Sequence, residues 1–244
     1  MRTILATTTI TVAALLTVSG AAHAAVLAQY TFQDSTTASS DTDPDSTASN
    51  ISGGTGISPT ISGSAANGNP APGYVDQVGT GSGVGDNSAP DDEQFALDND
   101  EYFSFTVTPT TGNRLNLAQL AFDADSEGTG FATPDDDWAL YTSVDSGDFS
   151  SVATSQAIDR GGIPRNSFTT QTVDLSDAKF QSLTAPVEFR LYVWMTRTQT
   201  NSVKELRLDN FELTGTVVPE PSSLALLGLA TVAAATARRR REPR

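Results

Sequence analysis

Cysteine is absent from the 244 residues, and the single histidine is His23. Without cysteine the chain has no disulfide, no thiolate metal site and no cysteine nucleophile. His23 lies in a segment that we expect to be removed during export, so the mature protein would contain no imidazole. A Ser-His-Asp triad and a histidine-ligated zinc site are then excluded.

Basic residues are scarce between the two ends of the chain. Six of the 14 Lys and Arg residues are Arg2, residues 238–241 and Arg244, so residues 25–217 hold 27 acidic side chains against 8 basic ones. The resulting net charge of −19 repels phosphate backbones, which argues against a nucleic-acid partner. The same charge favours solubility in salty surroundings and attracts divalent cations.

Residues 1–24 have the order of a secretory signal peptide. Met1 and Arg2 form a basic start, residues 4–18 are mildly apolar, and Ala22-His23-Ala24 matches a small-x-small cleavage site. The alternative is a buried N-terminal helix, but a segment rich in threonine and β-branched residues is a poor helix former. We therefore predict export, with signal peptidase cutting after Ala24.

Residues 218–244 contain a turn, an apolar run and a basic cluster, in that order. Pro219-Glu220-Pro221 is followed by the candidate membrane segment 222–237, in which residues 224–237 form an apolar run. As a helix this segment is about 24 Å long, slightly short of the roughly 30 Å hydrocarbon core of a bilayer. We predict a minimal transmembrane helix, and the positive-inside rule places the basic cluster in the cytoplasm and the acidic domain outside. The basic cluster consists of Arg238, Arg239, Arg240 and Arg241.

These features, in this order and together with a signal peptide, resemble the PEP-CTERM sorting domain. The resemblance implies that the chain is a substrate of the membrane protease exosortase. The tail would then be a transient anchor in the inner membrane, cut at or near Pro219-Glu220-Pro221. After the cut, the domain would be released or attached to the cell envelope or extracellular matrix. Residues 242–244, beyond the basic cluster, depart slightly from the family pattern.

Residues 25–217 are expected to form one acidic all-β domain, a β-sandwich of the jelly-roll type. Its region 35–90 is rich in Ser, Thr and Gly and reads as loops, with short strand candidates at 47–51 and 73–78. We expect one short helix at 176–183, capped by Ser176. Several segments also resemble the galactose-binding-like jelly rolls of single-domain PEP-CTERM proteins. Eight extended segments support the sandwich, at 26–32, 102–108, 115–124, 138–144, 151–158, 168–175, 187–196 and 206–216.

The segment 187–196 shows the clearest alternation of apolar and polar residues. One face carries Val187, Phe189, Leu191, Val193 and Met195, which we assign to the core.

In two other segments the alternation slips by one residue. One β-bulge near Ala118 and Gln119 and another near Asp209 and Asn210 would restore the phase.

The opposite face of segment 187–196 presents Arg190, Tyr192 and Trp194. Two aromatic rings beside a charge can stack a sugar ring, which suggests an extracellular polysaccharide as ligand. The alternative, which we favour, is that a long loop covers the aromatic rings and forms a second small core.

Acidic clusters supply oxygen ligands of the kind that calcium takes, but none has the spacing of an EF-hand loop. Asp209 is similar in placement to the acidic residue with which related carbohydrate-binding jelly rolls hold a structural calcium. The alternative is that these are solvated acidic loops. Pairs of carboxylates for glycoside hydrolysis are expected by chance among 27 acidic residues, so we assign no catalytic residue.

The sequence thus indicates an exported, exosortase-sorted protein of the cell envelope or extracellular matrix, without enzymatic activity and without a required cofactor. The alternative is a carbohydrate-binding module, with or without calcium, that recognises exopolysaccharide. A glycan hydrolase or lyase would require two carboxylates converging in an aromatic-lined cleft.

Overall fold

The computed structural model describes residues 25–32, 36–55, 57, 60–62, 74–79, 92–128, 136–146, 157–164, 167–195 and 204–220. The predicted signal peptide, the apolar segment 222–237 and the basic cluster 238–241 lie outside these residues. Within the described part of the chain, no helix is long and apolar enough to cross a membrane.

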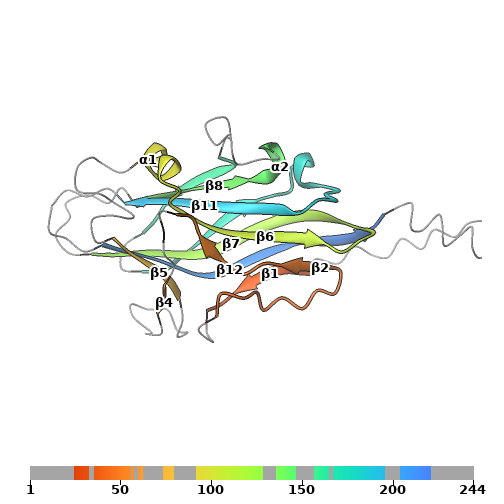
Figure 1. The fold of residues 1–244 in the computed structure, drawn as a ribbon, viewed down its shortest axis with the longest axis horizontal. Helices are drawn as coiled ribbons and strands as arrows, with labels where there is room; N and C mark the ends of the chain where they lie inside the picture. Colours follow the sequence, from red (N-terminus) through yellow and green to blue (C-terminus); the bar gives the residue numbers. More distant parts are fainter. Residues whose placement is uncertain are drawn as a thin grey trace, which may run out of the picture. The chain divides into compact units, whose positions relative to one another are not determined.

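Two antiparallel six-stranded sheets make up the fold (Figure 1). The first has the order β10 (Thr169–Asp174), β7 (Asn113–Gly128), β12 (Lys204–Pro219), β5 (Tyr74–Gly79) and β4 (Thr60–Ser62), with β1 (Ala25–Tyr30) also paired to β12. The second has the order β2 (Ser46–Ala48), β6 (Tyr102–Pro109), β11 (Val187–Met195), β8 (Asp136–Thr142) and β9 (Asp159–Gly162), with β3 (Ser52–Gly53) paired to β6. Short helical turns are α1 (Glu93–Asp98), α2 (Ser143–Ser146) and η2 (Ala178–Phe180).

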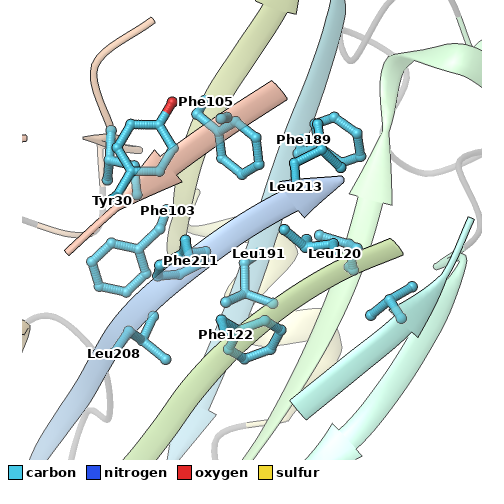
Figure 2. Close-up of a cluster of buried hydrophobic side chains, with 14 of the residues drawn as sticks. Tyr30, Phe103, Phe105, Leu120, Phe122, Phe189, Leu191, Leu208, Phe211 and Leu213 are labelled. Atoms are coloured by element: carbon cyan, nitrogen blue, oxygen red, sulfur yellow. The ribbon is translucent and has the colours of Figure 1, made fainter. Parts of the chain in front are cut away.

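The inner faces of the two sheets share one aromatic core (Figure 2). Phe122 of the first sheet meets Trp138 of the second edge-on, with ring centroids 5.2 Å apart. Phe105 and Phe211 make a similar contact across the sheets at 6.5 Å. The all-β sandwich is therefore confirmed. The predicted core face of β11 is also confirmed for its four residues of described burial, Val187, Phe189, Leu191 and Val193.

Both predicted β-bulges are present between β7 and β12. Asp209 pairs with Asp123 and Glu212 with Ala121, so β12 carries one extra residue there. Asn210 accommodates this bulge with a φ of 50°, in the left-handed region that asparagine tolerates. The second bulge adds a residue to β7, beside Ala118 and Gln119. These bulges bring the leucine and phenylalanine side chains on either side of them into the same core.

The helical turns differ from the prediction. The expected helix at 176–183 is only the 3₁₀ turn η2, and its cap is Asp177, whose side chain accepts a hydrogen bond from the Lys179 N–H at 3.1 Å. Ser176 is therefore not the cap, and its N–H instead donates to Asp174 Oδ1 at 2.8 Å.

Helix α1 was not predicted. It starts at an Asp92 cap, where Oδ1 accepts from the Phe95 N–H at 2.9 Å. Six residues are too few to show a helical period in the sequence.

Some predicted extended segments are displaced. The segment 151–158 is largely outside the described residues, and the strand near it, β9, begins only at Asp159. In the Ser/Thr/Gly-rich region, β2 and β3 occur where one strand at 47–51 was expected, and β5 matches the candidate at 73–78.

Candidate functional site

The outer face of the second sheet carries the predicted binding residues Arg190, Tyr192 and Trp194. Within β11 these three alternate with the core residues, as the sequence indicated. Cross-strand pairing sets Tyr192 opposite Tyr102 of β6, and their rings lie 5.0 Å apart. Tyr141 of β8 meets the other side of Tyr192, with centroids at 5.1 Å. Three tyrosines from three adjacent strands therefore meet on this face.

Helix α1 covers this aromatic face. Ala96 and Leu97 of α1 pack with Tyr192 and Trp194 in a second small hydrophobic cluster, separate from the main core. Tyr192 is 0% exposed and Trp194 is 8% exposed. The two rings are therefore not an open stacking platform. The arrangement is the second small core that the sequence offered as the alternative, because an amphipathic turn buries them.

Glu93, the first residue of α1, connects the helix to the sheet. Its carboxylate accepts two hydrogen bonds from Arg160 of β9, from Nε and Nη2, each at 2.8 Å. It also accepts a hydrogen bond from the Tyr141 hydroxyl at 2.6 Å. The Arg160 hydrogen bonds hold the pKa of Glu93 below its usual value, while burial and Glu93 raise the pKa of Tyr141. The Glu93 carboxylate and the Tyr141 hydroxyl therefore both hold α1 against the sheet.

Arg190 is also engaged by its neighbours. Its Nε donates to Glu188 at 2.7 Å, and its guanidinium lies 4.5 Å from the centre of the Tyr102 ring, a cation–π distance. Burial raises the pKa of Tyr192 to about 12, so this tyrosine is neutral at physiological pH and cannot act there as a base.

Asp209, the predicted calcium ligand, is fully buried at the β12 bulge. One of its oxygens accepts the Asn210 N–H at 2.7 Å. The Asn210 side chain donates to Asp123 at 2.8 Å, and the Thr170 hydroxyl donates to the other Asp123 oxygen at 2.6 Å. Across the described part of the chain, no group of three or more His, Cys, Asp or Glu side chains is placed to hold a metal ion.

A buried ion pair lies two residues away on the same two strands. Arg207 Nη1 is 3.5 Å from Asp125 Oδ2, and both side chains are almost completely buried. The Ser167 N–H donates to the other Asp125 oxygen at 2.8 Å. Burial raises the pKa of Asp125, and the Ser167 hydrogen bond and Arg207 only partly oppose it.

The sorting motif begins inside the fold. Val217, Val218 and Pro219 are the last residues of β12 and pair with Leu115, Arg114 and Asn113 of β7, respectively. Glu220 follows directly, and Pro221 and residues 238–241 are outside the described part of the chain.

Sequence reasoning missed four residues that shape the covered face, Glu93, Tyr102, Tyr141 and Arg160. The alternation of Tyr102 with Phe103 and Phe105 would have placed it outward, and the same logic applies to Tyr141 beside Leu140. No sequence signal joins Glu93 to Arg160, because 67 residues separate them.

Comparison with known families identifies the PEP-CTERM protein-sorting motif at residues 217–241. The expected sorting tail, with Pro219, Glu220 and Pro221 at its start, is therefore confirmed. No curated protein matches the chain.

Two solved structures show a distant likeness to the chain. The cleaved adhesin domain K1 of Lys-gingipain from Porphyromonas gingivalis W83 is 15% identical with a TM-score of 0.38, over 76% of this chain and 95% of that chain. A Stig cyclase from Fischerella sp. TAU is 12% identical with a TM-score of 0.34, over 81% and 90%. Likenesses this distant carry no argument about function.

Proposed function

We propose that this protein is a non-catalytic component of the cell envelope or extracellular matrix that needs no cofactor and is delivered by an exosortase-type pathway. The observation that carries the proposal is the PEP-CTERM motif at 217–241, which starts at the last strand of a β-sandwich. Signal peptidase would remove residues 1–24. Residues 222–237 would hold the precursor in the inner membrane until the tail is cut.

The domain itself would be a jelly roll. Its two strand orders, β1-β12-β7-β10 and β6-β11-β8-β9, support this. Among these eight strands the chain crosses from one sheet to the other at every step except from β8 to β9, as in two interleaved Greek keys. Jelly rolls are common in proteins that present a rigid surface outside the cell. The net charge of −19 over residues 25–217 suits a protein that must stay soluble there.

The covered face of the second sheet supports a structural role over a catalytic one. Its described carboxylate–arginine pairs are structural, since Glu93 with Arg160 fixes α1 and Glu188 with Arg190 joins neighbours within β11. Sugar binding through Arg190, Tyr192 and Trp194 would require α1 to leave the sheet, so we do not propose it.

The proposal is tested by intact mass of the protein recovered from the medium and from the membrane fraction of the producing organism. We expect a released form that lacks residues 1–24 and everything after the Pro219 region. A variant with Pro219, Glu220 and Pro221 changed to alanine should stay in the membrane with its tail.

The matched control changes Glu242 and Pro243 to alanine, which alters the same residue types outside the motif, and it should be processed normally. A wild-type protein that stays in the membrane and keeps residues 238–244 would make the tail a permanent anchor and would overturn the proposal.

A further inference from the structure

The sorting motif has no linker between it and the folded domain. Pro219 is both the first residue of the Pro219-Glu220-Pro221 tripeptide and the last residue of β12, where it pairs with Asn113. Pro221 lies two positions beyond Pro219, a reach of about 7 Å in an extended chain. A protease that cuts at or near the motif therefore acts within a few ångströms of the sheet.

A strand paired in a sheet is a poor protease substrate. Proteases and other peptide-binding proteins commonly take extended segments through their main-chain N–H and C=O groups. In an antiparallel pair, successive residues alternate between facing the partner strand with both main-chain groups and facing away from it. Leu115 gives its N–H and C=O to Leu183, so the next pair, Arg114 with Val218, is the one whose main-chain groups face each other. Val218 is therefore shielded on its β7 side while the end of β12 remains in place.

The β7 side of this junction is secured from other directions. The Leu115 N–H and C=O bond to the backbone of Leu183 at 2.8 and 2.9 Å. The Asn113 side chain donates to Thr110 at 2.8 Å and to Asp45 at 3.2 Å. Strand β7 therefore has supports besides β12.

The end of β12 has weaker support. Val217 packs only partly buried against the core, and Val218 is 36% exposed. When the junction opens, β12 is the strand that leaves, because β7 keeps its other partners.

We infer that residues 217–219 form a gate, which must detach from β7 before the sorting protease can cut the tail. The folded sandwich thereby limits the rate of its own release. This inference rests on the proposed function, because it assumes that the tail is cut. It adds that the rate depends on a strand whose partner residues, 113–115, lie more than 100 positions earlier in the chain.

A disulfide across the gate tests the inference in the full chain. Arg114 and Val218 are direct cross-strand partners, and such partners lie about 4.5 to 5.5 Å apart at Cα, within the range for a disulfide. The chain has no other cysteine, so the Arg114→Cys/Val218→Cys variant forms one defined bond. Cleavage is followed by intact mass in membranes of the producing organism, with the oxidised and reduced forms compared.

The matched control is Asn116→Cys/Thr216→Cys, which joins the same strands two pairs farther from the motif and leaves residues 217–219 free to open. Oxidation of the Arg114/Val218 pair should slow cleavage about tenfold or more, because fraying at a strand end is normally easy and the bond prevents it. Oxidation of the control pair should change the rate by far less. Circular dichroism checks that both variants are folded.

Equal cleavage of the oxidised and reduced Arg114/Val218 forms would overturn the gate and leave the sorting proposal intact. If that disulfide does not form, insertion of Gly-Ser-Gly-Ser between Val218 and Pro219 replaces it as the test. This insertion should speed cleavage, and an unchanged rate would overturn the gate. Failure of the sorting proposal appears differently, as a wild-type tail that is never cut.

Discussion

Glu93 and Arg160 form a bidentate ion pair that joins the first residue of α1 to strand β9. Because α1 lies over Tyr192 and Trp194, this pair helps to keep the outer face of the second sheet closed. The carboxylate also accepts the Tyr141 hydroxyl, so one side chain links the helix to two strands.

The Glu93→Gln variant should lower the free energy of unfolding near neutral pH by up to about 1 kcal/mol, since the pair is partly exposed to solvent. The folded pKa of Glu93 is lowered from 4.5, first by the Arg160 hydrogen bond. The stabilisation is therefore complete above pH 4.5 and is lost as the pH falls through the lower folded pKa. Urea unfolding at a series of pH values measures this.

Asp98→Asn on the same helix is the control for Glu93→Gln, since its side chain accepts only from Gln94 among the hydrogen bonds described. A difference between wild type and Glu93→Gln that persists unchanged at strongly acidic pH would contradict the ion-pair account.

Two tyrosines on the covered face should differ in how much stability is lost with the hydroxyl. Tyr141→Phe removes a 2.6 Å hydrogen bond to Glu93 and should cost about 1 kcal/mol or more, because the acceptor is charged. The buried Tyr192 hydroxyl has no comparable short hydrogen bond to a charged carboxylate, although Arg190 lies close enough to lower its pKa, so Tyr192→Phe should cost less than Tyr141→Phe. Chemical denaturation of the two variants compares them directly, and an equal loss in both would be evidence against this assignment.

Gly161 leaves room for the Trp138 indole in the core. A Cβ at Gly161 would lie 2.8 Å from two indole carbons, so Gly161→Ala should displace the ring and cost about 1 to 3 kcal/mol through overpacking. The near-ultraviolet circular dichroism of tryptophan should change as well. Gly162→Ala is the neighbouring control, because its Cβ would meet only a flexible Asp137 oxygen at 3.4 Å. Identical spectra and stabilities for Gly161→Ala and Gly162→Ala would contradict the predicted clash with Trp138.

Arg207→Met should destabilise the fold by about 3 to 5 kcal/mol near neutral pH, because it leaves the buried Asp125 carboxylate without its cation. Burial already raises the folded pKa of Asp125 above 3.8, and losing Arg207 raises that pKa further. The folded state then favours the protonated acid, so the loss should shrink as the pH falls through the raised pKa.

The double variant Asp125→Asn/Arg207→Met provides the control for the buried pair, since it removes both charges and should recover part of the stability. Urea unfolding of the wild type and of the single and double variants over the same pH series gives the double-mutant cycle for this pair. If the loss of stability in Arg207→Met does not depend on pH, then Arg207 does not stabilise the fold through its ion pair with Asp125.

Local patterns in the sequence predicted much of the sandwich. Alternation in the 187–196 segment predicted the core face of β11, and the slipped phases near Ala118 and Asp209 predicted both bulges, because side-chain period and burial are tied residue by residue along a strand. The sorting motif was equally accessible, since Pro219-Glu220-Pro221 and the residues after it are contiguous in the chain.

Contacts between distant segments were decided only by the tertiary structure. The sequence placed Tyr192 and Trp194 on the outer face of β11, but their burial depends on α1, which is too short to have a periodic signature. The pairing of Pro219 with Asn113 likewise arises from strand order, which local propensity does not encode. The sequence alone determined which residues face the core and where the sorting tail begins. Tertiary packing decided what covers the aromatic face and what holds the start of the tail, because both depend on segments far apart in the chain.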